Sequence, residues 1–171
     1  MTVDRRFKIG IINWLCKNNF SNIDVDFEYD FGYAVDDDLG IHCLNIGVEA
    51  NNAAGTFFEQ FLYEYGCDYV GIPYPILALI HELGHIATIN NFSQTELKLF
   101  ELAKEFSHGE SDHDWFFRYW EMPDEFAATM WAVDFINEHI DAVEELCNFF
   151  IPTWIEMCET IDVFSLVKEA A

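Results

Sequence analysis

The chain has few basic residues. Eight lysines and arginines stand against 31 aspartates and glutamates in 171 residues, which gives a formal net charge of −23 at pH 7. Nucleic-acid binding depends on lysine and arginine side chains that neutralise phosphates, so this composition argues against direct binding to DNA or RNA. The same charge attracts cationic partners and speeds their encounter with the protein.

Long apolar runs are also missing. A membrane-spanning helix requires about 20 consecutive apolar residues, and the longest run here, residues 70–80, is much shorter. The start of the chain places basic residues before an apolar stretch, as a signal peptide does. However, Asn13 and Trp14 interrupt that stretch, and no small-residue cleavage site follows it. We therefore expect an amphipathic helix over residues 4–19 and no membrane partner.

Paired cysteines of the CxxC type are absent. The chain has five cysteines, an odd number, at positions 16, 43, 67, 147 and 158. Without a secretory signal, cysteines of this number and spacing are most simply reduced residues of the core. The sequence therefore predicts a cytoplasmic protein.

Apolar and aromatic residues, by contrast, are abundant. Hydrophobic residues make up 51% of the chain, which includes 17 Phe, 7 Tyr and 5 Trp. This content excludes disorder despite the high charge. A chain of this length can bury one good-sized core, and no internal repeat or linker divides it. We expect a single domain over residues 1–171.

The periodicity of apolar residues predicts an α+β fold. Apolar and acidic residues alternate over residues 23–31, which is typical of a half-exposed strand that Gly32 ends, and residues 41–48 form a second strand. The turn at residues 36–40 suggests that the two strands form a hairpin. An extended segment is expected over residues 68–72. Further helices are expected over residues 57–65, 96–106, 123–139, 141–150 and 152–167.

The most informative motif is His81-Glu82-Leu83-Gly84-His85. This HExxH pattern is the signature of a zinc-peptidase helix, because residues i and i+4 lie on the same helical face and can offer two imidazole nitrogens to one metal ion. Glu82 then lies beside a metal-bound water and can act as its general base. A chance match or a purely structural zinc would leave Glu82 without a role.

The residues around the motif favour the metal site over a chance match. Residues 76–80 and 86–89 are almost entirely apolar, which is typical of a helix buried in the core. Two imidazoles and a carboxylate in such a helix each need a partner, because an unpaired buried polar group is costly. A shared zinc ion satisfies all three side chains.

A catalytic zinc site needs a third protein ligand and an open fourth position. The metzincin pattern requires Gly and His where Thr88 and Asn91 stand, so that class is excluded. A carboxylate on a later helix remains, and Glu125, 40 residues after His85, is the first choice. Asp124 and Glu121 are the alternatives. Thr129, one turn beyond Glu125, is placed to orient the carboxylate or a ligand histidine.

Two histidines in the polar loop over residues 107–114 are candidates for a further role. His108 or His113 can supply an additional ligand, or a donor that stabilises the tetrahedral oxyanion. We expect His113 to be the catalytic one, because it stands between two aspartates. The alternative for both histidines is a solvated loop residue.

The HELGH motif, followed by a helix that bears the Glu-x-x-Ala pattern of Glu125 and Ala128 and a Phe-Ala-Ala run, resembles the gluzincin branch of zinc peptidases. It is most similar to small cytosolic members of the ImmA/IrrE type and to the peptidase-like domains of phage and plasmid antirestriction proteins. Those families usually have an acidic residue or Asn where Thr129 stands. The resemblance covers residues 75–90 and 121–132. It implies a zincin-like fold, with a small antiparallel-containing sheet, the metal-binding helix packed on it and a glutamate helix crossing below.

These observations predict a zinc metallopeptidase that hydrolyses peptide bonds with a zinc-activated water. Its ligands would be His81, His85 and Glu125, and its acidic surface favours basic peptides or protein segments as substrates. The alternative is an interaction protein that keeps the zincin fold without catalysis. Its carboxylates would then imitate DNA and bind the basic groove of a nucleic-acid-binding enzyme, as an inhibitor encoded by a mobile element does.

Overall fold

A small mixed sheet and a set of helices make up the protein, in agreement with the predicted α+β class. The computed structural model describes residues 2–28, 31–36, 41–47, 62–69, 71–106 and 118–160. In chain order its elements are helix α1 (Val3–Lys17), strands β1 (Ile23–Glu28), β2 (Gly32–Asp36) and β3 (Ile41–Gly47), helix α3 (Tyr74–Thr88), the 3-10 turn η1 (Ile89–Asn91), and helices α4 (Gln94–Phe106), α6 (Pro123–Glu138) and α7 (Ile140–Thr160).

The sheet has the strand order β1-β3-β2. Strand β3 pairs antiparallel with β2 and parallel with β1. The predicted hairpin between residues 23–31 and 41–48 is therefore wrong, because β2 supplies the antiparallel neighbour of β3. Alternating apolar residues fix which face of a strand is buried, as at Val25 and Leu44, but they do not fix the direction of its neighbour.

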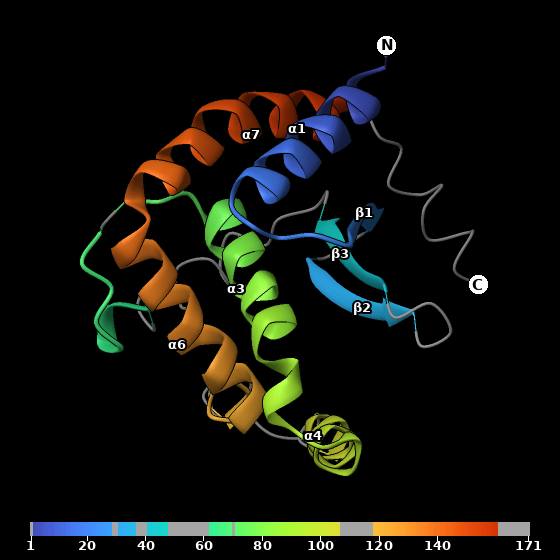
Figure 1. Ribbon diagram of the computed structural model, residues 1–171, viewed down its shortest axis with the longest axis vertical. Helices are drawn as coiled ribbons and strands as arrows, with labels where there is room; N and C mark the ends of the chain where they lie inside the picture. The colour runs from blue at the N-terminus through green and yellow to red at the C-terminus, as the bar shows by residue number, and fades with distance from the viewer. Residues whose placement is uncertain are drawn as a thin grey trace.

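The longer helices lie in two pairs next to the sheet, and α4 lies apart from both pairs, near the ends of α3 and α6 (Figure 1). Helices α3 and α6 run side by side next to the sheet, and α1 and α7 lie together across one end of the molecule. The pair α1–α7 is joined by aromatic packing, since the rings of Phe7 and Phe150 meet at 4.7 Å between centroids and both residues are fully buried. This packing leaves α3 enclosed by α6, the sheet and α7.

Local signals explain where α4 and α6 begin. Ser93 and Glu96 form a capping box at the start of α4, in which the Ser93 backbone N–H donates to the Glu96 carboxylate at 2.8 Å and the Glu96 backbone N–H donates to the Ser93 hydroxyl at 3.3 Å. Helix α6 begins at Pro123, as predicted, because proline is accepted in the first turn, where its missing N–H is not needed.

Helix α7 is continuous where the sequence predicted two helices, over residues 141–150 and 152–167. It runs through the exposed Pro152 to Thr160, and the residues after 160 lie outside the described part of the chain. Proline inside a helix removes one backbone hydrogen bond and costs about 3 kcal/mol. Phe150 and Met157, two turns apart on one buried face, offset that cost. Burial of the apolar face therefore overrides the local break.

Three further predictions concern other segments. All five cysteines are free, but Cys16 is exposed, so the expectation that every cysteine is a core residue is wrong. Residues 68–69 and 71–72, where an extended segment was expected, have no regular secondary structure. Of the helix expected over residues 57–65, the structure describes residues 62–65, and residues 62–64 form a short helical turn. None of the described helices has the length and apolarity to cross a membrane.

Candidate metal centre

The two motif histidines lie one turn apart on the buried face of α3. His81 and His85 are 2% and 5% exposed, and nearly every residue of this helix from Pro75 to His85 is buried. Pro73 and Pro75 at the start of the helix and the apolar residues that follow explain why the segment is helical and enclosed. The imidazoles are thus held in the interior, where each needs a partner.

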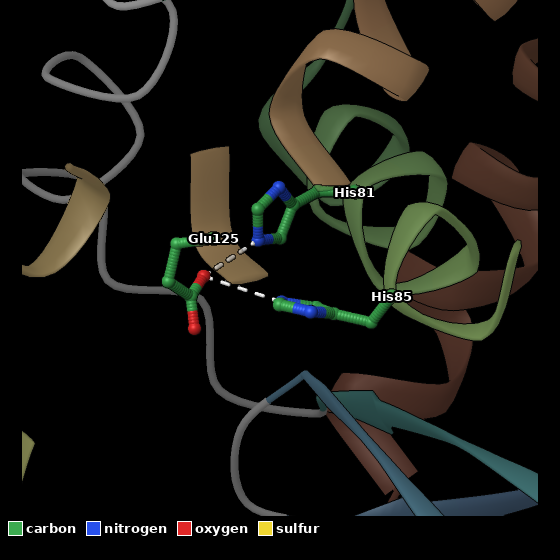
Figure 2. A group of neighbouring side chains, drawn as sticks. All are labelled: His81, His85 and Glu125. Atoms are coloured by element: carbon green, nitrogen blue, oxygen red, sulfur yellow. Dashed lines mark hydrogen bonds and ion pairs between the residues drawn. The ribbon is translucent and has the colours of Figure 1, made fainter. Parts of the chain in front are cut away.

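Glu125, in the first turn of α6, is that partner. Its side chain is 2% exposed, and its Oε2 atom lies 3.0 Å from His81 Nε2 and 3.2 Å from His85 Nε2. Figure 2 shows that both imidazole rings, which belong to α3, are directed at this one oxygen of the Glu125 side chain on α6. The structure therefore brings together the three residues that the sequence predicted as ligands.

The spacing of these atoms would allow them to hold a metal ion. One nitrogen or oxygen from each residue lies within 4.8 Å of the others. In a tetrahedral site with metal–ligand distances of about 2.0 to 2.1 Å, ligand atoms are about 3.3 Å apart. The two nitrogen–oxygen distances come close to that value. Two imidazoles and one carboxylate also form a donor set that catalytic zinc sites use.

The close approach of α3 and α6 depends on Gly84, between the two histidines. A Cβ atom at this position would lie 3.0 Å from both the Cα and the carbonyl carbon of Ala128, and closer still to the Ala128 carbonyl oxygen. Ala128 is fully buried. The two small residues let the helix backbones meet one turn from Glu125, so that its short side chain reaches both imidazoles.

Residues outside α3 also contact both imidazole rings. The hydroxyl of Thr129 lies 3.4 Å from His81 Nδ1, which places Thr129 where the sequence predicted a residue that orients a ligand histidine. The Trp120 ring meets the His81 ring edge-on at 4.9 Å. Tyr33, on β2, stacks on the His85 ring at 4.8 Å. Both rings are thus fixed in position from different elements.

The second oxygen of Glu125 faces a lysine. Lys104, in the last turn of α4, donates from Nζ to Glu125 Oε1 at 2.6 Å and to Asp124 Oδ2 at 2.7 Å. Its ammonium also lies 5.1 Å from the centre of the Tyr119 ring. Asp124, an alternative third ligand in the sequence, is thus directed at Lys104 rather than at the histidines. Glu121, the other alternative, is exposed.

The electrostatics of the cluster favour an ionised Glu125. Burial by itself would raise the pKa of Glu125, but hydrogen bonds with His81 and His85 hold that pKa well below its usual range. Burial alone would lower the pKa of His85, yet the hydrogen bond and charge of Glu125 raise it. A carboxylate buried with so little water requires compensating positive charge, which protonated imidazoles, Lys104 or a metal ion can supply.

Glu82 differs from its neighbours in the motif because it is only partly buried. Burial raises the pKa of its carboxyl, while the adjacent His81 and His85 act in the opposite direction. Glu82 is not part of the three-residue cluster found among the described residues. Glu82 is therefore next to the cluster in the sequence and partly open to solvent.

The sequence predictions omitted several residues of the site. Lys104, Tyr119, Trp120 and Tyr33 come from elements whose position relative to α3 no local pattern reveals. The one signal for Lys104 in the sequence was that basic residues are few, since only eight lysines and arginines stand against 31 acidic residues. His108 and the predicted catalytic His113 lie outside the described residues.

Comparisons with protein-family models, with curated proteins and with solved structures give no match for this chain.

Proposed function

We propose that the protein is a zinc-dependent metallopeptidase with a gluzincin-type site on a zincin-like fold. The observation that carries the proposal is the convergence of His81, His85 and Glu125 from two helices on one buried point. Partly exposed Glu82 stands beside this cluster, where a general base is required. A structural metal would need a fourth protein ligand, and the described residues offer three.

The three ligands would hold zinc with nitrogen from His81 and His85 and oxygen from Glu125. When bound, zinc lowers the pKa of a coordinated water toward about 7 and polarises a carbonyl group. Thr129 would fix the His81 ring, since its hydroxyl, 3.4 Å from Nδ1, can accept a hydrogen bond from Nδ1–H and so leave the Nε2 lone pair free for the metal. The chain thus contributes a rigid, charge-balanced set of donors.

Glu82 moves the proton in this proposal. It accepts a proton from the attacking water, whose oxygen bonds to the scissile carbonyl carbon. The C–N bond then breaks, and Glu82 gives the proton to the leaving amine nitrogen. The desolvation that raises the pKa of Glu82 suits this role, because a carboxylate with a raised pKa is a stronger base.

The substrate class follows from charge and from the position of β2. With a net charge of −23, the protein favours basic peptides or protein segments. β2 is an outer strand of the described sheet, and Tyr33 from this strand touches His85. An extended peptide that pairs with β2 through backbone hydrogen bonds would pass the site. Residues 68–69 and 71–72, which precede the helix with the two histidines, form no strand, so we assign this task to β2. We place this activity in the cytoplasm, as the composition predicted.

Metal analysis and peptide cleavage test the proposal together. The purified chain should contain one zinc per molecule, and His81→Ala should lose it, while His139→Ala, a change at an exposed histidine, should keep it. Glu82→Gln should retain zinc and lose about 10²- to 10⁴-fold in kcat/KM on basic peptides. Full activity of zinc-loaded Glu82→Gln would show that the assigned base is wrong.

The net charge also favours a second candidate, an acidic interaction protein that retains the fold and inhibits a nucleic-acid-binding enzyme. In that case the chain would bind a DNA-binding enzyme in competition with DNA, and His81→Ala would leave that binding intact. Peptide cleavage that depends on both zinc and Glu82 would decide for the peptidase.

A further inference from the structure

The two oxygens of Glu125 have different partners. Oε2 faces the two imidazoles, whereas Oε1 accepts a hydrogen bond from Lys104 Nζ at 2.6 Å. Lys104 comes from α4, which follows α3 in the chain and lies near the ends of α3 and α6 (Figure 1). The carboxylate is thus held from two sides, and only one of its oxygens is directed at the metal position.

We propose that Lys104 is a positioning residue that confines Glu125 to ligation through one oxygen. The inference rests on the proposed metal site and deepens it. A carboxylate that binds through both oxygens would occupy a fourth coordination position. A catalytic zinc site needs that position for water and substrate. By holding Oε1 away, Lys104 keeps the position open.

Burial makes this restraint strong. The side chains of Lys104, Asp124 and Glu125 are 14%, 7% and 2% exposed. Charge-assisted hydrogen bonds between such groups are shorter and stronger than neutral ones, and water cannot readily replace them.

Asp124 gives Lys104 a fixed location. Its Oδ2 accepts from Lys104, while its Oδ1 is buried with no hydrogen-bond partner among the described residues. Without Lys104, two adjacent buried carboxylates would lose the ammonium that compensates their charge. Tyr119 also hydrogen-bonds Glu125, but its neutral hydroxyl supplies no charge, so the Glu125 oxygen released by Lys104 would turn to the nearest cation. With zinc bound, that cation is the metal.

Cobalt substitution tests the inference, because four-coordinate Co²⁺ absorbs visible light more strongly than five-coordinate Co²⁺. The chain loaded with Co²⁺ should show the strong bands of four-coordination. Lys104→Met should show weaker bands and bind Zn²⁺ about 10- to 100-fold less tightly in competition with a chromophoric chelator. Lys104→Arg, which keeps the charge and two donors, should restore most of the intensity and affinity.

Lys98→Met is the matched control, since Lys98 is an exposed lysine on the same helix and its loss changes the net charge equally. It should leave the spectrum and the Zn²⁺ affinity unchanged. If Lys104→Met does not fold by circular dichroism, Lys104→Gln, which removes the charge but keeps an amide NH₂ group on a shorter side chain, gives the same comparison, and weaker bands are again expected.

The outcomes separate this inference from the peptidase proposal. Identical Co²⁺ spectra and Zn²⁺ affinities for the chain and for its folded Lys104 variant would overturn the role of Lys104, whatever the activity. Altered spectra in a chain that cleaves no peptide would support the role of Lys104 and count against the peptidase. A chain that binds neither Zn²⁺ nor Co²⁺ would overturn both.

Discussion

Gly84 on α3 faces the backbone of Ala128 on α6 so closely that a Cβ atom would lie 3.0 Å from the Ala128 carbonyl carbon. This contact sets the distance between the helix that carries the two histidines and the helix that carries the carboxylate. A residue in one of the variable positions of the HExxH motif thus has a structural task. The task is to let Glu125 reach His81 and His85.

Replacement of Gly84 by alanine should separate the two helices. Alanine normally stabilises a helix by about 1 kcal/mol relative to glycine, but here the added methyl would meet rigid backbone atoms, and we expect a net loss of about 1–3 kcal/mol. Zinc affinity should fall as well, because Glu125 moves with α6. Urea unfolding and zinc competition measure the two effects.

Gly10→Ala is the control for that substitution. A Cβ at Gly10, in α1, would meet only the side chain of Phe149, at 3.0 Å, and a side chain can shift where a backbone cannot. Its unfolding free energy should change little, and its zinc affinity not at all. Equal losses in the two variants would mean that the contact between α3 and α6 has no special role.

Replacement of Thr129 by valine should weaken metal binding without unfolding the chain. Valine fills the same fully buried space but removes the hydroxyl 3.4 Å from His81 Nδ1. Loss of a partner that orients a ligand histidine typically weakens metal affinity about 10- to 100-fold. Thr88→Val removes a different buried hydroxyl, which donates to the Gly84 carbonyl, and should leave zinc affinity unchanged. If both variants bind zinc like the parent chain, Thr129 does not orient His81.

The excess of acidic residues predicts a salt-dependent substrate preference. Between about 0.01 M and 0.15 M salt the Debye length shortens from about 30 Å to about 8 Å, which screens the attraction of the chain for cationic peptides. The kcat/KM for a lysine-rich peptide should fall about 10-fold over this range. An uncharged peptide with the same scissile bond should show little change. Parallel salt dependence for both peptides would rule out the surface charge as the source of preference.

Replacement of Pro152 by alanine should stabilise the protein. Pro152 lies inside α7 on its exposed side, where it cannot donate a backbone hydrogen bond. The carbonyl that loses a donor in this way is that of Asn148, one turn earlier. Alanine restores the missing donor, and we expect the free energy of unfolding to rise by about 1–3 kcal/mol. Unfolding of the variant at a lower urea concentration would show that the proline shapes α7 favourably.

The sequence alone determined the local features of this protein. The i, i+4 spacing of His81 and His85 puts both imidazoles on one face of any helix, so the metal-binding face needed no tertiary information. The start of α6 followed from Pro123, which acts within a single turn, whereas α4 begins at Gln94, two residues before the predicted start at residue 96. Glu125 was selected as the first of three acids, because an acid in the first turn of an apolar helix can point inward.

Only the tertiary structure decided which groups meet. The choice among Glu121, Asp124 and Glu125 depends on the rotation of α6 against α3, which the contact of Gly84 with Ala128 fixes. Lys104 reaches Glu125 because α4 lies close to the start of α6. The parallel pairing of β1 with β3 is likewise a contact between segments that are separated in the sequence. Such pairings depend on burial and charge compensation between distant segments, and the periodicity of one segment contains no information about them.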